Sequence, residues 1–312
     1  MRLTYPKGER ATTPRALSGA VRGYNAPMPN ADAALLKQLS GNSAPYRDPL
    51  ALIDWAALHR DSHWLPEPAL SLYGLPEYET LSDAVKRRLS QYEFINVMQC
   101  GLWLEAVFLQ RLARRLRPAL PRAEYEYFLH ELREETGHSL MFLKAIEASG
   151  LPLPEDAWRA PRLADALARF LPAGGVVFWL AVVIGEDVPD KFNRFVRQGA
   201  EHINAAVRQI LTAHIIDEAR HLALARGQLE ARLQACGPAR RALLLVAARW
   251  LLGELAEVFY FPPARFYELA GLTRGAAWRR LALNNAARRR FVAQCLAPTS
   301  RMLEGYGLRP GN

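Results

Sequence analysis

Two short strings of this sequence hold residue types that bind metal ions. One contains Glu135 and His138, and the other repeats the same Glu-x-x-His spacing at Glu218 and His221. On an α-helix, residues three apart lie on one face about one turn apart, so each pair can direct a carboxylate and an imidazole at the same ion. Paired motifs of this kind, with two further buried glutamates, form carboxylate-bridged dinuclear metal sites in helical bundles. The strings therefore indicate a pair of metal ions.

Two more glutamates lie in strongly apolar surroundings. Glu105 interrupts the apolar stretch 101–109, and Glu186 follows the apolar run 176–184. Burying a lone carboxylate costs on the order of several kcal/mol, so each needs a compensating partner. Two metal ions would provide it, although pairing with one of the many arginines is an alternative that the sequence leaves open.

His214 lies one turn before Glu218 in the second string. On a helix His214, Glu218 and His221 fall within about 60° of one another, so their side chains converge. We therefore predict His214 as a further ligand, the alternative being an ordinary core or surface histidine. Carboxylates and imidazoles together favour iron or manganese over metals that prefer thiolates. The acidic residues Glu134 and Asp217, which precede the motif glutamates, are predicted to hydrogen-bond the ligand imidazoles.

Four segments with helical periodicity must position these residues. Prolines and glycines that begin or end helices place these segments at about 81–116, 122–150, 176–199 and 204–236. Shorter helices are expected at 162–171, 239–258 and 276–305. The predicted fold is all-α, with a ferritin-like four-helix bundle core and additional flanking helices.

The N-terminal quarter of the chain has a different composition. Residues 1–45 are rich in Pro, Gly and Asn and indicate an arm or coil, and the segment to about residue 79, with Trp55, Trp64 and Tyr73, is expected to pack on the bundle as a lid or flank. We therefore divide the chain into an N-terminal arm and flanking segment, 1–80, and a helical metal-binding domain, 81–312.

Composition excludes several other classes. The chain has 312 residues and a formal net charge of +9, but its arginines are scattered through helices without a nucleic-acid motif. The basic surface is expected to be solvated or to steer an acidic partner such as a carrier protein or a reductase. No signal peptide or membrane span is expected, and Cys100, Cys236 and Cys295 form no Cys-x-x-Cys pair. These features predict a cytoplasmic protein with core thiols.

At the residues described above, the sequence resembles the AurF-type family of non-haem di-iron N-oxygenases, which oxidise p-aminobenzoate or other arylamines. The resemblance covers about residues 80–305, and its most specific element is the His-x-x-x-Glu-x-x-His string that begins at His214. It implies iron ligation by seven residues, which are Glu105, Glu135, His138, Glu186, His214, Glu218 and His221.

The same resemblance implies a reaction. It predicts two iron ions cycling between Fe2+ and Fe3+, O2 as co-substrate, and oxidation of an amine, in particular an arylamine, toward hydroxylamine, nitroso or nitro products. Natural-product biosynthesis is the expected context. No flavin or nicotinamide fingerprint occurs in the sequence, so electrons are expected from a separate reductase or ferredoxin. A homodimer is a further expectation at the level of the family.

Two other functions stay open, because a bundle and a ligand set do not dictate a reaction. One is a di-iron desaturase, hydroxylase or oxidase acting on an acyl or amino-acid substrate, and the other is a ferritin-like iron-binding protein. Five aromatic residues could line a pocket for a flat substrate, although core packing explains each of them as well. They are Trp103, Phe178, Trp179, Phe259 and Tyr260.

Overall fold

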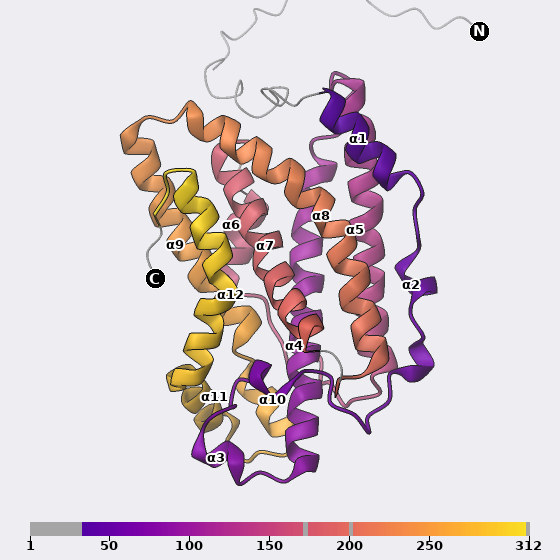
Figure 1. Ribbon diagram of the computed structural model, residues 1–312, viewed down its shortest axis with the longest axis vertical. Helices are drawn as coiled ribbons and strands as arrows, with labels where there is room; N and C mark the ends of the chain where they lie inside the picture. The colour runs from indigo at the N-terminus through magenta and orange to yellow at the C-terminus, as the bar shows by residue number, and fades with distance from the viewer. Residues whose placement is uncertain (1–32, 171–173, 200–201, 310–312) are drawn as a thin grey trace, which may run out of the picture.

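The computed structural model describes residues 33–170, 174–199 and 202–309, which form helices and no strands. The predicted all-α class is thereby confirmed. Figure 1 shows long helices running side by side with shorter ones around them. In chain order the α-helices are α1 (Ala33–Ser43), α2 (Pro49–Leu52), α3 (Pro76–Glu79), α4 (Asp83–Ala113), α5 (Arg122–Ala148), α6 (Arg162–Phe170), α7 (Val176–Gln198), α8 (Ala205–Gln234), α9 (Pro238–Tyr260), α10 (Ala264–Leu269), α11 (Gly275–Asn284) and α12 (Ala286–Gly305).

The long helices α4, α5, α7 and α8 form the predicted bundle core. α4 packs on α5 and α7 packs on α8, and short connections make the two helices of each pair antiparallel (Figure 1). α6 lies on the longer connection between the pairs and packs on α4. The ends of all four long helices fall within about three residues of the positions that the sequence predicts.

Local signals explain where these helices begin and end. Asn204 caps α8, because its side-chain oxygen accepts hydrogen bonds from the backbone N–H groups of Ala206 and Val207. Ser82 occupies the corresponding position before α4 but makes no side-chain capping bond. After α5, Gly150 adopts a φ of 58°, the left-handed conformation that favours glycine at a helix C-terminus.

The C-terminal region differs from the prediction in one respect. The helix expected over 276–305 is two helices, α11 and α12, which meet at Asn285. The Asn285 side chain caps α12 and also donates to the carbonyl oxygens of Ser71 and Tyr73, at 3.0 and 2.9 Å. These long-range bonds hold Asn285 in an extended conformation, which ends one helix and starts the next.

The predicted N-terminal arm also needs a correction, since its last part is helical. Residues 33–43 form α1, which packs on α5, whereas residues 1–32 of the expected arm lie outside the described residues. The following segment packs on the bundle as a flank. Its Trp64 is fully buried and meets the ring of Phe94 edge to face, with 5.8 Å between the ring centroids.

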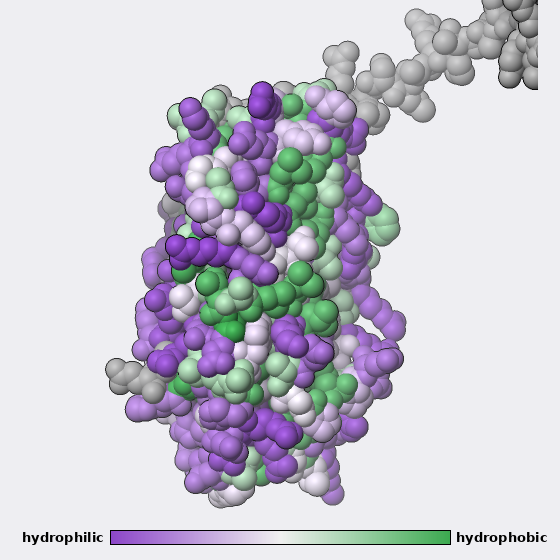
Figure 2. All heavy atoms as spheres, turned by 90° about the vertical axis from the view of Figure 1, so that its right-hand side faces the viewer, coloured by the Kyte–Doolittle hydropathy of each residue, from purple (hydrophilic) through white to green (hydrophobic). Residues whose placement is uncertain are grey.

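The surface mixes polar and apolar side chains. Figure 2 shows the face that carries α1 and α2, where hydrophobic residues lie among hydrophilic ones. Among the exposed large apolar side chains of the described residues are Leu129, Leu140 and Leu143 of α5 and Ile216 of α8. The three cysteines are buried and free. In the described part of the chain, no helix combines the length and apolar character required to cross a bilayer.

Candidate metal centre

The predicted ligands come together inside the bundle. α4 supplies Glu105, α5 supplies one Glu-x-x-His motif, α7 supplies Glu186, and α8 supplies the string from His214 to His221. Each of the seven side chains belongs to a residue that is at most 5% exposed. The helices thus gather four carboxylates and three imidazoles where water has little access.

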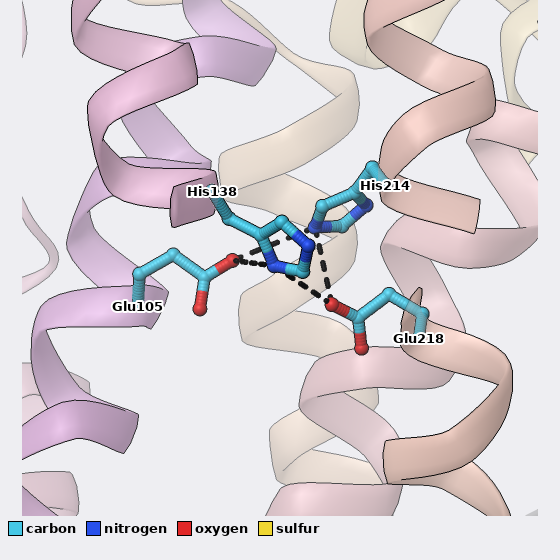
Figure 3. A group of neighbouring side chains, drawn as sticks. All are labelled: Glu105, His138, His214 and Glu218. Carbon is cyan, nitrogen blue, oxygen red and sulfur yellow. Dashed lines mark hydrogen bonds and ion pairs between the residues drawn. The ribbon is translucent and has the colours of Figure 1, made fainter. Parts of the chain in front are cut away.

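The first group consists of Glu105, His138, His214 and Glu218, whose potential ligand atoms all lie within 4.8 Å of one another. Nδ1 of His138 is 3.6 Å from Oε1 of Glu105 and 3.3 Å from Oε1 of Glu218. Nε2 of His214 lies 3.5 and 3.3 Å from the same two oxygens. Figure 3 shows these four side chains pointing toward one another from facing helices.

The second group consists of Glu135, Glu218 and His221. Nδ1 of His221 is 3.2 Å from Oε1 of Glu135 and 3.4 Å from Oε2 of Glu218. The other oxygen of each glutamate faces His138 of the first group, at 3.2 and 3.3 Å. Glu135 and Glu218 therefore each present one oxygen to either group, as carboxylates between two metal ions do.

Glu186 is buried on α7 but belongs to neither group. Burial, followed by the charges of Glu218 and Glu135, raises the pKa of Glu186 well above its ordinary value. The Glu186 carboxylate therefore lies close enough to Glu218 and Glu135 for their charges to act on it. Its role as a ligand, like that of the other six residues, remains a prediction.

Unpartnered polar atoms test whether the site fits metal ions. Both side-chain oxygens of Glu218, Oε2 of Glu105, Oε1 of Glu135 and Nδ1 of His221 are buried and have no hydrogen-bond partner. Leaving such groups unpaired is costly, at roughly 1–3 kcal/mol each and more when they are charged. Two divalent cations would satisfy these atoms with the hard oxygen and imidazole donors that iron and manganese accept, so the residues present fit a dinuclear metal site.

The two acidic residues expected to support the imidazoles also lie close to them. Oδ2 of Asp217 is 3.2 Å from Nε2 of His138, and Oε2 of Glu134 is 3.0 Å from Nε2 of His221. Each acid on one helix thus contacts a histidine on the facing helix. Such a bond keeps the proton on Nε2 and directs the Nδ1 lone pair into the cluster.

Arg220 is a site residue that the sequence argument missed. Its Nη2 donates to Oε1 of Glu134 at 2.8 Å and also to Oδ1 of Asp217. One guanidinium therefore holds both carboxylates that support His138 and His221. The local signal was its place three residues after Asp217, but its reach to Glu134 depends on how α5 and α8 pack.

Asn193 was missed as well. Nδ2 of its side-chain amide lies 3.1 Å from Nδ1 of His214, and its Oδ1 is buried without a hydrogen-bond partner. A metal bound at Nε2 of His214 would require the proton on Nδ1, so the amide would have to turn its oxygen toward Nδ1 to accept that proton. Burial lowers the pKa of His214 to about 4, so its ring is neutral at pH 7, as a ligand must be.

The aromatic residues considered for a substrate pocket have different surroundings. Trp103 and Phe178 line an apolar cavity between α4, α6, α7 and α9. Trp179 packs under the guanidinium groups of two arginines, and Tyr260 packs on Phe192 in the outer core. Of the five aromatic residues considered, all of which lie in the described part of the chain, only the first two line that cavity.

The fold and the site together define a ferritin-like bundle with a buried carboxylate–histidine cluster. Within this class, the chain belongs to the p-aminobenzoate N-oxygenase AurF family, whose family model matches residues 29–307. This membership and the cluster make the protein an oxidoreductase of the oxygenase and oxidase type. The predicted resemblance is thereby confirmed.

Several known proteins are similar to this chain. Two uncharacterized proteins, from Mycobacterium tuberculosis and Mycobacterium bovis, are 25% identical over 278 residues, which cover 86% of this chain and 79% of theirs. Among solved structures, a point mutant of an R2-like ligand-binding oxidase with a reconstituted Mn/Fe cofactor matches with a TM-score of 0.51 and 14% identity, covering 89% of this chain and 94% of the other. Another point mutant, with an Fe/Fe cofactor, matches with the same TM-score and coverage at 13% identity. These structural likenesses support the ferritin-like fold.

Proposed function

We propose that the protein is a dinuclear metal oxygenase that uses O2 to oxidise the nitrogen of an amine, in particular an arylamine. The observation that carries this proposal is the arrangement of Glu135 and Glu218, each of which presents one oxygen to either group of imidazoles. Membership of the AurF family supports the amine nitrogen as the atom that is oxidised.

In this proposal, Glu105, His138 and His214 would hold one metal ion, Glu186 and His221 would hold the other, and Glu135 and Glu218 would supply oxygens to both. Iron suits this donor set, and manganese is the alternative because the structurally similar oxidases were reconstituted with Fe/Fe or Mn/Fe. When bound and reduced, the metal pair supplies the electrons that activate O2.

The surrounding residues contribute orientation and a dry environment. Asp217 and Glu134 keep the Nε2 protons on the imidazoles, and Arg220 fixes both acids. Burial of the ligands excludes bulk water, which would otherwise quench reactive oxidised species.

The reaction needs an external electron donor to balance. An amine, one O2, two electrons and two protons give the hydroxylamine and one water, and one N–H bond is replaced by N–OH. Further rounds lead to nitroso and nitro products. A separate reductase or ferredoxin is proposed as the donor, and the basic net charge of the chain would favour an acidic one.

The direct test is to load the protein anaerobically with ferrous iron, measure iron per chain, admit O2 with a reductant and matched arylamines and alkylamines, and follow product mass. We expect two iron ions per chain and incorporation of oxygen at the amine nitrogen. A double variant, Glu135→Ala with Glu218→Ala, serves as the control and is expected to lose both iron and product. Oxygen consumption with every amine left unchanged would contradict N-oxygenation.

A second candidate is an oxidase, hydroxylase or desaturase acting on an acyl or amino-acid substrate, which the likeness in fold to R2-like ligand-binding oxidases favours. Including such substrates in the same assay separates the two reactions. A ferritin-like storage role would require a cage of many chains, and light scattering on the iron-loaded protein would reveal it.

A further inference from the structure

The outer face of α5 carries an exposed apolar stripe. Leu129, Leu140 and Leu143 are 48%, 48% and 55% exposed, Leu132 is half-buried, and Thr136 lies exposed between them. Successive members are three or four residues apart, so on a helix all of them lie within about 40° of the direction of Thr136. α1 and α2 pack beside α5 and leave the stripe exposed. Apolar side chains that gather on one exposed helix face mark an interaction surface.

The stripe reads the same in both chain directions. Leucines lie four and seven residues before Thr136 and again four and seven residues after it. If two antiparallel copies of α5 are related by a two-fold axis at Thr136, Leu129 of one copy meets Leu143 of the other, and Leu132 meets Leu140. The seam between them is about 21 Å long, because 14 residue steps of a helix rise about 1.5 Å each. The pattern thus matches a second copy of the same helix.

The charged residues beside the stripe fit the same arrangement. Glu126 lies ten residues before Thr136 and Lys144 eight residues after it, and the helical period places both on one flank of the stripe. In the antiparallel pair, Glu126 of one copy and Lys144 of the other would differ by two residue steps, or about 3 Å along the helix axis. Arg122 and Glu147, fourteen residues before Thr136 and eleven after it, would differ by about 4.5 Å. Opposite charges therefore meet at both ends of the seam.

These four charges favour a second copy over a partner of one sign. Arg122 and Glu126 lie on the exposed surface, and the side chains of Lys144 and Glu147, which are 43% and 72% exposed, pair at 2.9 Å within the chain. Each end of the seam would gather two basic and two acidic side chains. A strongly acidic or strongly basic partner would instead place like charges against half of them, which opposes binding.

We propose that two copies of this chain associate through α5, with the two helices antiparallel across a two-fold axis at Thr136. The inference goes beyond the proposed function and holds whatever reaction the protein performs. Glu135 and His138 lie on the buried side of the same helix, so the two metal centres would lie on opposite sides of the joined helices.

The first test measures the mass of the full chain in solution by sedimentation equilibrium. We expect about twice the 35.0 kDa of one chain. Leu140→Glu sets a carboxylate against Leu132 of the other copy, twice in each pair, and should raise the dissociation constant about a hundredfold or more. Leu163→Glu, the same change at an exposed leucine of α6, is the control and should leave the mass unchanged. Because both leucines are exposed, each variant should keep its helical fold, which circular dichroism checks.

The second test identifies the axis and the charge pairs. Thr136→Cys should form a disulfide between two copies under mild oxidation, whereas Ala242→Cys, at an exposed position of α9, should not. The three native cysteines are buried and do not compete. Glu126→Lys and Lys144→Glu should each weaken association about three- to tenfold at low salt. The double variant, which restores opposite charges across the seam, should recover most of that loss.

Several results would overturn the proposal. A single-chain mass at concentrations up to about 0.1 mM would exclude the pair, because even weak specific complexes form in that range. A pair that Leu140→Glu leaves intact would place the contact on another face. Thr136→Cys that forms no more disulfide than Ala242→Cys would remove the axis from that residue. None of these measurements depends on metal or substrate, so their failure is separate from any failure of the proposed oxygenase reaction.

Discussion

At the residue scale, the site combines what short sequence spacing can predict with what it cannot. The Glu135–His138 and Glu218–His221 pairs, and His214 before them, follow from the period of a helix. Arg220 on α8 contacts Glu134 on α5, and Asn193 on α7 contacts His214 on α8. Both contacts depend on how the helices pack. Such contacts between helices have no local signature in a single sequence, so the reach of Arg220 to Glu134 and the contact of Asn193 with His214 could not be predicted.

The first prediction concerns His214. Replacing it by alanine removes the Nε2 atom that faces Glu105 and Glu218 at 3.5 and 3.3 Å. We expect bound iron to fall from two ions per chain toward one, because the second group keeps its own imidazole. Iron content after gel filtration measures this, and a full complement of iron in the variant would remove His214 from the ligand set.

The second prediction concerns Arg220 and its contacts with Glu134 and Asp217. Arg220→Gln removes the charge that holds Glu134 and Asp217, so the imidazoles lose their fixed orientation. Loss of such supporting contacts typically lowers metal affinity about 10- to 100-fold. Arg208→Gln, an exposed arginine on the same helix, is the control. Chelator competition for ferrous iron compares the two, and equal affinities would show that these contacts do not support the site.

At the scale of the element, the sequence predicts the four bundle helices well because prolines, glycines and an Asn cap mark their ends. It misses the break at Asn285, since good helix formers flank it and the bonds that hold it extended come from Ser71 and Tyr73, more than two hundred residues away. The helix α1 was likewise hidden by the polar composition around it. Tertiary contacts override local preference at such places.

A prediction at this scale tests the cap of α8. The Asn204 side chain accepts from two backbone N–H groups and donates to the carbonyl of Ala57 at 2.8 Å and to Oγ of Ser62 at 3.0 Å. Asn204→Ala should therefore lower the free energy of unfolding by about 1–3 kcal/mol. In Ser82→Ala, where no capping bond is lost, about 0.5 kcal/mol or less is expected. Urea unfolding gives both values, and equal losses would contradict the assigned role of the cap.

At the scale of the whole molecule, the cluster makes stability depend on metal and on pH. Burial raises the pKa of Glu131 to about 8, although the charge of His221 opposes the shift. Such a carboxyl group takes up a proton more readily in the folded chain, so its contribution to stability is lost as pH rises from about 4.5 through 8. Burial alone would lower the pKa of His138 and His221, but neighbouring carboxylates outweigh it and raise both pKa values. The stability that these two charged imidazoles provide is lost as pH rises above about 6.5.

We therefore expect the melting temperature of the metal-free protein to fall between about pH 6.5 and 9, and to lie below that of the iron-loaded protein throughout. His214, whose folded-state pKa is about 4, opposes this fall only up to about one pH unit above its ordinary value of 6.5. Glu131→Gln should flatten the slope. Scanning fluorimetry with and without iron measures the pH trend, the difference between the metal-free and iron-loaded protein, and the effect of Glu131→Gln. Identical curves for the two forms would refute the coupling of metal binding to stability.

Glu218 directs one oxygen toward His138 and the other toward His221. This shared side chain links the uptake of the two metal ions. The first ion to arrive fixes this shared side chain but also neutralises part of the negative charge that attracts the next ion, so the two ions should enter in separate steps. At sub-stoichiometric metal, many chains should therefore hold a single ion.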